Sequence, residues 1–104
     1  MKIIENDKQD RLVVQKDEYD SDCLEGGLLW ELINSIELDF VIAGDEGCAS
    51  NWDMYYPLYN HYSGKLFLVL GKDCADYQNG KPVELLGKEP DNDDLEWLRE
   101  NGVI

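Results

Sequence analysis

The alternation of apolar and polar residues along the chain predicts several short strands. In the segment 65–70, the residues after Lys65 are apolar at consecutive positions, which is typical of a central strand buried on both faces. Asn79-Gly80 is a strong hairpin signal, and Pro82 places the strand after it at a sheet edge, because proline cannot donate to a ladder. In chain order, the pattern predicts strands around 3–4, 11–15, 38–43, 65–70 and 83–86.

Two further segments have the pattern of amphipathic helices. The first covers about 23–36, where Asp22 and Glu25 have capping-box spacing. It is expected to bury Leu29, Leu32, Ile33 and Ile36. The second covers about 91–101, capped by Asp91 or Asn92, with acidic residues at its N-terminal end and Gly102 as the stop. The expected fold is therefore α+β: one acidic domain over 1–104, with an antiparallel sheet of about four or five strands and two helices.

Residues 52–62 are rich in aromatic side chains and contain no cation. Helical spacing would align Trp52, Tyr55, Tyr59 and Tyr62, but Pro57 argues against an unbroken helix. In a strand, Tyr56 shares a face with Trp52, Met54 and Leu58, while Tyr55, Pro57 and Tyr59 share the other. The strand interpretation pairs this segment with 65–70 through a turn at Ser63-Gly64.

Charge is the most unusual property of the chain. The 104 residues include 23 acidic and 9 basic side chains, for a net charge of −14. This argues against direct binding to nucleic acid or an anionic membrane, where Lys and Arg supply the affinity. Residues 17–64, the acidic block, hold eleven carboxylates and no Lys or Arg. A field of this sign attracts a basic partner, and we expect the acidic block to supply the binding face for it.

Catalytic and metal-binding patterns are weak. Cys23, Cys48 and Cys74 are widely spaced and odd in number, which favours reduced thiols over a disulfide framework or a metal knuckle. His61 is the sole histidine, the carboxylate-rich stretches fail the register of a calcium loop, and no cofactor motif is present. Cys48 and His61 are the residues that a small cysteine-dependent enzyme or ligand-binding protein would use.

In size, acidity and lack of a catalytic signature, the chain resembles several kinds of protein inhibitor. These are anti-CRISPR and other phage anti-defence proteins, nucleic-acid mimics, and immunity proteins against toxin nucleases. The resemblance implies a non-catalytic inhibitor that blocks a basic nuclease, toxin or nucleic-acid-binding effector. The residues expected at that protein–protein interface are Asp45, Glu46, Trp52, Asp53, Tyr55, Tyr56 and Tyr59.

Two alternatives remain at this stage: the small enzyme that uses Cys48 and His61, and an accessory structural domain whose charge serves solubility. Because no apolar segment of membrane-spanning length or signal-peptide form is present, we expect a cytoplasmic protein, in a bacterial cell or a phage-infected host.

Overall fold

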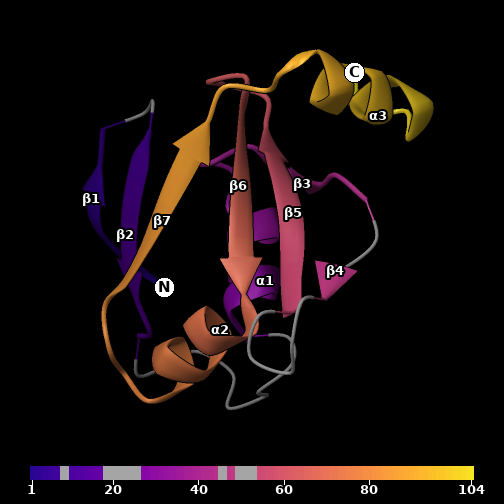
Figure 1. Ribbon diagram of the computed structural model, residues 1–104. Coiled ribbons are helices and arrows are strands. Elements are labelled where there is room, and N and C mark those ends of the chain that lie inside the picture. Colours follow the sequence, from indigo (N-terminus) through magenta and orange to yellow (C-terminus); the bar gives the residue numbers. More distant parts are fainter. Residues whose placement is uncertain (8–9, 18–26, 45–46, 49–53) are drawn as a thin grey trace.

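The computed structural model describes residues 1–7, 10–17, 27–44, 47–48 and 54–104 (Figure 1). They form an α+β fold whose strands pair in antiparallel fashion. The elements in chain order are β1 (Lys2–Asn6), β2 (Arg11–Gln15), α1 (Gly27–Asn34), β3 (Phe40–Ile42), β4 (Gly47–Cys48), β5 (Met54–Asn60), β6 (Lys65–Leu70), α2 (Gly71–Gln78), β7 (Val83–Lys88) and α3 (Asn92–Glu100).

The strands form one curled sheet in the order β1-β2-β7-β6-β5-β3, with β4 paired to β5. Strand β7 pairs with β2 over four residues, but it meets β6 only at Leu66↔Lys88 and Phe67↔Gly87. The two strands therefore separate beyond this short ladder, as Figure 1 shows. This divergence bends the β1-β2-β7 part of the sheet away from the β6-β5-β3 part.

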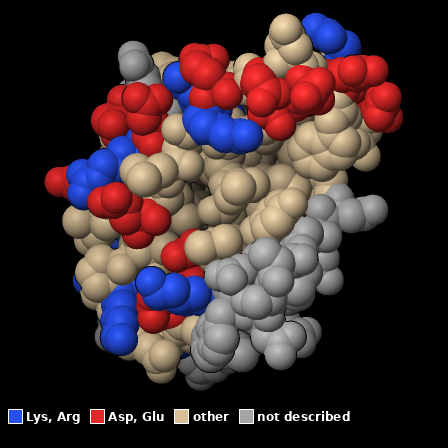
Figure 2. Space-filling view, viewed as in Figure 1, with Lys and Arg blue, Asp and Glu red and all other residues tan. Residues whose placement is uncertain are grey.

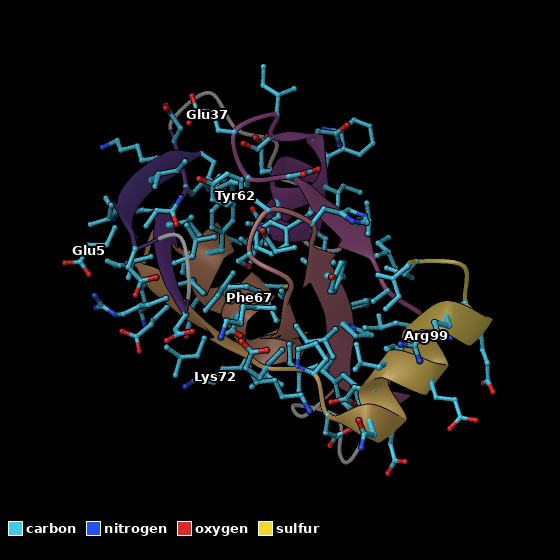
Figure 3. All side chains as sticks on the ribbon, turned by 90° about the horizontal axis from the view of Figure 1, so that it is seen from above. Glu5, Glu37, Tyr62, Phe67, Lys72 and Arg99 are labelled. Atoms are coloured by element: carbon cyan, nitrogen blue, oxygen red, sulfur yellow. The ribbon has the colours of Figure 1, made fainter. Side chains whose placement is uncertain are left out.

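The inner face of the curled sheet packs against α1 and α2 (Figure 1). Phe67 lies near the middle of this core and meets Phe40 edge to face, with ring centroids 5.1 Å apart. In the view from above, Glu5, Glu37 and Arg99 lie at the periphery (Figure 3). The buried core residues come from both helices, five strands and the turn before β3: Leu12, Val14, Leu28, Leu29, Leu32, Leu38, Phe40, Leu58, Phe67, Val69, Tyr77, Val83 and Leu85.

The outer face of the sheet has a smaller core under α3. Leu98 is fully buried there against Leu66 and Ala43, and Tyr59, Trp97 and Val103 pack around them. Trp97 lies directly on the backbone of Gly44, since a Cβ at residue 44 would come within 2.2 Å of the indole. Helix α3 is thus attached to the sheet by one apolar side, and it covers one end of the outer face.

Several predictions from the sequence pattern are confirmed. The strands expected at 3–4 and 11–15 are present and pair with each other, the strand at 65–70 pairs with residues 54–60 as expected, and β6 lies inside the sheet. Residues 54–60 form a strand that pairs with β6, with Tyr56 packed on the inner core and Tyr59 on the outer one. Asp91 is the N-cap of α3, which ends just before Gly102.

The prediction for the first helix is wrong at its C-terminal end. Within the described residues the helix spans Gly27–Asn34, and residues 23–26 lie outside them. Leu29 and Leu32 are buried and Ile33 is half-buried, as expected, but Ile36 is 97% exposed. Because the helix ends two residues earlier, Ile36 falls in the turn toward β3 and leaves the apolar face.

The region after β6 also differs from the prediction. Residues 71–78 form helix α2, whose Asp73 carboxylate accepts the Leu70 N–H at 3.0 Å. Asn79-Gly80 therefore ends a helix and does not form a hairpin turn, with Gly80 at φ +78°. The strand after it lies between β2 and β6, not at an edge, because Pro82 precedes the ladder and removes no hydrogen bond from it.

The described part of the chain has seven strands and three helices, more than the four or five strands and two helices expected. The elements that the pattern did not predict are short or weakly apolar: the two-residue β4 and helix α2. The strand expected at 38–43 is present as the three-residue β3. None of the described helices is long and apolar enough to cross a membrane.

Leu32 and Ile36 offer a matched test of this packing. Leu32→Ala removes a side chain that has no exposed surface, so it is expected to lower the free energy of unfolding by about 2–5 kcal/mol. Ile36→Ala alters a side chain in solvent and is expected to change it by less than about 0.5 kcal/mol. Urea unfolding monitored by circular dichroism measures both, and equal effects would show that the turn after α1 is misplaced.

Candidate functional site

Helix α3 begins with a pair of reciprocal hydrogen bonds. The Asp94 N–H donates to Asp91 Oδ1 at 2.8 Å, and the Asp91 N–H donates to Asp94 Oδ2 at 3.1 Å. Each carboxylate thus satisfies an amide that the first turn of a helix leaves without a partner. This capping box explains why the acidic run 91–94 forms a helix, because both charges lie at its positive end.

The solvent side of α3 is strongly acidic. Asp93, Glu96 and Glu100 follow the i, i+3, i+7 spacing of one helix face and are exposed. These three carboxylates take part in no ion pair with any residue that the structure describes. We call the full set the α3 acidic surface; it consists of Glu89, Asp91, Asp93, Asp94, Glu96 and Glu100.

Asp94 differs from the other members because it points back toward the sheet. Its carboxylate lies 3.1 Å from Lys88 Nζ, and its side chain is 23% exposed. Burial raises the pKa of Asp94, but the Asp91 N–H and the Lys88 ammonium together outweigh it. The pKa of Asp94 therefore lies below its ordinary value.

Lys65 is the first residue of β6, and its side chain connects this strand to two other segments of the chain. Its ammonium lies 2.6 Å from Glu89 and 3.3 Å from Asp10, and the side chain is only 16% exposed. The hydrogen bond with Glu89, opposed by burial and aided by Asp10, raises the pKa of Lys65. The Gly87 N–H also donates to the Asp10 carbonyl at 2.7 Å. These contacts tie the β1–β2 turn to the segment between β7 and α3.

An apolar groove lies between α3 and the outer face of the sheet. Its volume is about 260 Å³. Leu68 in its floor is 42% exposed although it belongs to β6, inside the sheet. The salt bridge between Lys88 and Asp94 lies at its border with α3. We call this the outer groove; it is lined by Tyr55, Pro57, Leu66, Leu68, Lys88, Asp94 and Trp97.

The outer groove and the α3 acidic surface belong to the same side of the molecule. In Figure 2, acidic side chains gather at the α3 end, and uncharged side chains cover the hollowed centre over β6. An apolar centre beside a charged border is the usual anatomy of a protein–protein interface.

The interface residues predicted from the sequence have different positions. Asp45, Glu46, Trp52 and Asp53 lie outside the described residues. Tyr55 lines the outer groove, Tyr59 packs under α3, and Tyr56 packs against the inner core on the opposite face of β5. Of the three tyrosines, the structure thus places only Tyr55 at the outer groove.

The acidic block 17–64 is described only in part. Asp17, Glu31, Glu37 and Asp39 are its described carboxylates, and Glu31 lies 3.9 Å from the N-terminal ammonium. The other seven carboxylates lie outside the described residues, so the expectation that the block supplies the binding face stays a prediction.

The Cys48 and His61 pair is separated by the length of a strand. Cys48 pairs with Met54 at the start of β5, whereas His61 follows Asn60 at its end. Seven extended residues span roughly 20 Å, too far for a shared proton. His61 is exposed and instead meets the Tyr59 ring edge to face, with the ring centroids 5.0 Å apart.

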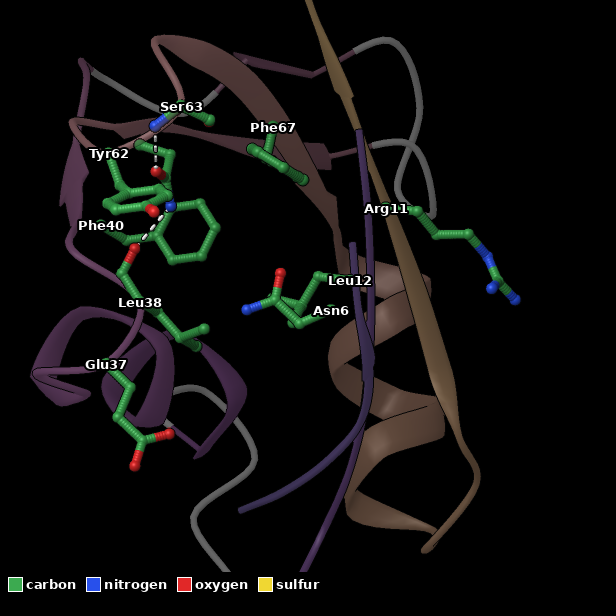
Figure 4. A pocket seen from close by; sticks show the side chains of 10 residues that line it. Asn6, Arg11, Leu12, Glu37, Leu38, Phe40, Tyr62, Ser63 and Phe67 are labelled. Atoms are coloured by element: carbon green, nitrogen blue, oxygen red, sulfur yellow. Dashed lines mark hydrogen bonds between the residues drawn. The ribbon is translucent and has the colours of Figure 1, made fainter. Parts of the chain in front are cut away.

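A second cavity, of about 80 Å³, opens at the end of the inner core near the β5–β6 turn (Figure 4). Its floor is apolar and includes Phe40 and Phe67. Asn60 on its wall donates to the Leu38 carbonyl and accepts the Ser63 N–H. Arg11 points away from the cavity toward Glu5 and Glu84 (Figure 4). The polar groups of Asn60 and Arg11 are thus engaged within the protein.

Within the described ranges, no three His, Cys, Asp or Glu residues come together in a metal-binding arrangement. Cys74 lies in α2 and packs against the inner core. Burial, with a smaller contribution from the Asp73 charge, raises the pKa of the Cys74 thiol to about 11. Such a thiol is a poor nucleophile at neutral pH. Cys23 and the Cys48 side chain lie outside what the structure describes.

Sequence reasoning missed Leu68, Trp97 and the acidic residues of α3 as members of a candidate site. The acidic run 91–94 was assigned to helix capping alone, although Glu96 and Glu100 lie beyond the first turn. Their spacing with Asp93 was the available signal. No local signal marks Leu68, because its exposure depends on how far α3 extends over the sheet.

The comparisons with known proteins do not assign the chain to a family. No family model, curated protein or solved structure gave a match. The geometry described above is therefore the basis of the functional argument.

The lowered pKa of Asp94 leads to a pH-dependent effect on stability. Its ionised form is stabilised in the folded chain, so its contribution is present above the unfolded pKa and is lost as pH falls through the lower, folded pKa. Asp94→Asn is expected to be less stable than the wild type at pH 7. The difference should disappear in acid, and Glu96→Asn is a control on the same helix. Thermal unfolding from pH 7 to pH 2 measures this; a constant difference would contradict it.

Cys74 is expected to react slowly with iodoacetamide while the protein is folded. A rise of its pKa from 9.0 to about 11 leaves roughly a hundredfold less thiolate at pH 8. Peptide-resolved mass spectrometry measures its alkylation in the folded and urea-unfolded chain. Equal rates in the two states would show that the thiol is not protected.

Proposed function

We propose that the protein is a non-catalytic acidic inhibitor that binds and blocks a basic protein, of the nuclease or nucleic-acid-binding kind. The observation that carries the proposal is the α3 acidic surface beside the open outer groove. Three of its carboxylates lie on one exposed helix face without a cation paired to them among the described residues. The net charge of −14 gives the whole chain a field of the same sign.

The physical basis is complementarity to a cleft that binds phosphates. Proteins that bind nucleic acid hold Lys and Arg where the phosphates lie. A helix presents carboxylates at intervals of about 5–6 Å on a rigid frame, because residues three and four apart are neighbours on its surface. Carboxylates on α3 can therefore occupy such a cleft without the ordering cost that a flexible acidic tail would incur.

The position of this surface extends the expectation from the sequence. The acidic block 17–64 was expected to supply the binding face, whereas the α3 acidic surface lies in residues 89–100. We retain the block as a source of long-range attraction and assign close contact to α3 and Tyr55. Charges far from the contact act mainly on the association rate.

Affinity capture tests the proposal. The tagged protein is incubated with bacterial lysate at about 0.1 M and about 1 M salt, and the bound proteins are identified by mass spectrometry. Because the Debye length falls from about 10 Å to about 3 Å over this range, a basic partner should be retained mainly at low salt. If the partner is a nuclease, purified protein should inhibit its cleavage of nucleic acid. Capture of acidic partners, or capture unaffected by salt, would contradict the proposal.

Charge reversal locates the surface. The double variant Asp93→Lys/Glu96→Lys should slow association with the captured partner on the order of tenfold or more at low salt. Glu37→Lys, an exposed carboxylate in the acidic block and away from α3, is the control and should have a smaller effect. Stopped-flow or surface plasmon resonance measures the rates. A larger effect at Glu37 would place the contact in the acidic block instead.

A further inference from the structure

Leu68 is exposed where a sheet normally excludes water. Strand β6 is flanked by β5 and β7, and its neighbours Phe67 and Val69 are buried on the inner face. On the outer face, Leu66 is covered by α3, but Leu68, one pleat further along, is 42% exposed. The cover that α3 provides therefore stops between these two leucines.

The neighbouring strands bound the exposed surface at Leu68. Pro57, which pairs with Leu68 on β5, is buried and lines the outer groove beside Tyr55. On the other side, the β6–β7 ladder ends at Phe67↔Gly87, and the two strands separate at the level of Leu68. The exposed apolar surface of the outer groove is thus centred on Leu68. Exposed apolar surface with a polar border marks interaction sites on protein surfaces.

The charge around the outer groove decides between a second copy of this chain and another protein. Two copies meeting at this face would bring two α3 acidic surfaces together, each on a chain of net charge −14. Like charges that face each other across an interface repel and oppose association. A basic protein instead gains Coulomb attraction from the same carboxylates.

We propose that the outer groove receives an apolar side chain of the basic partner, while Lys or Arg residues beside that anchor pair with Asp93 and Glu96 of α3. This inference rests on the proposed function and adds the point of contact. Asp94 is already neutralised by Lys88 at the border, so the carboxylates with no ion-pair partner among the described residues are those further out on the helix. An apolar anchor in a desolvated pocket dominates the lifetime of a complex, and the flanking charges dominate its rate of formation.

Leu68→Ser tests the anchor site. It should increase the dissociation rate of the partner identified by affinity capture by on the order of thirtyfold, with little change in association. Ile36→Ser is the matched control. It removes an exposed side chain of the same size from a turn outside the groove, so it should leave the association and dissociation rates unchanged. Thermal unfolding of both variants checks that the fold is intact.

A photo-cross-linker replaces the dissociation measurement if Leu68→Ser unfolds. Benzoylphenylalanine at position 68 should cross-link the basic partner in lysate, whereas the same group at position 36 should not. Salt-sensitive capture together with unchanged dissociation of Leu68→Ser, or with cross-links only at position 36, would overturn the anchor site and leave the proposed function intact. A cross-link at position 68 to a second copy of this chain would also overturn it. Failure of the wild type to capture any basic protein would overturn both proposals.

Discussion

The burial of β6 on both faces is the constraint on which the rest of the structure depends. Leu66 and Phe67 are adjacent in sequence and point to opposite faces of the sheet, yet both are almost fully buried. A strand of this kind needs a layer on each side. Helices α1 and α2 supply one layer, and α3 supplies part of the other. The position of α3 is therefore a requirement of β6, and the length of α3 determines how much of the outer face stays open.

The division of charge follows from the same arrangement. Helix α3 buries Leu98 and half-buries Asp94, Leu95 and Trp97, so its other positions face solvent and can carry acids without disturbing the core. The first-turn acids are stabilised by the helix dipole and by the reciprocal hydrogen bonds of Asp91 and Asp94. Glu96 and Glu100 take part in neither of these stabilising interactions. Their side chains are exposed to solvent.

The sequence predicted those elements whose signals are local. The apolar run 66–70 and the capped helix after Asp91 each have a pattern that a single kind of structure satisfies, and both are present. For residues 54–60, Pro57 argued against a helix, and the segment is a strand. Helix α2 was missed because Tyr77 is its only buried residue, so it has almost no apolar stripe. The outer groove could not be predicted, because the exposure of Leu68 is set by the docking of α3, which starts more than twenty residues later in the chain.

The contact between Gly44 and Trp97 has a consequence for how distant relatives could be recognised. The indole occupies the space that any side chain at residue 44 would need, and two residues more than fifty positions apart are thereby linked. Evolution can enlarge residue 44 only if residue 97 becomes smaller or α3 shifts off the sheet. In a divergent lineage, the two positions should therefore change together. A coupled change at these two positions would indicate that a distant relative keeps α3 docked on the sheet.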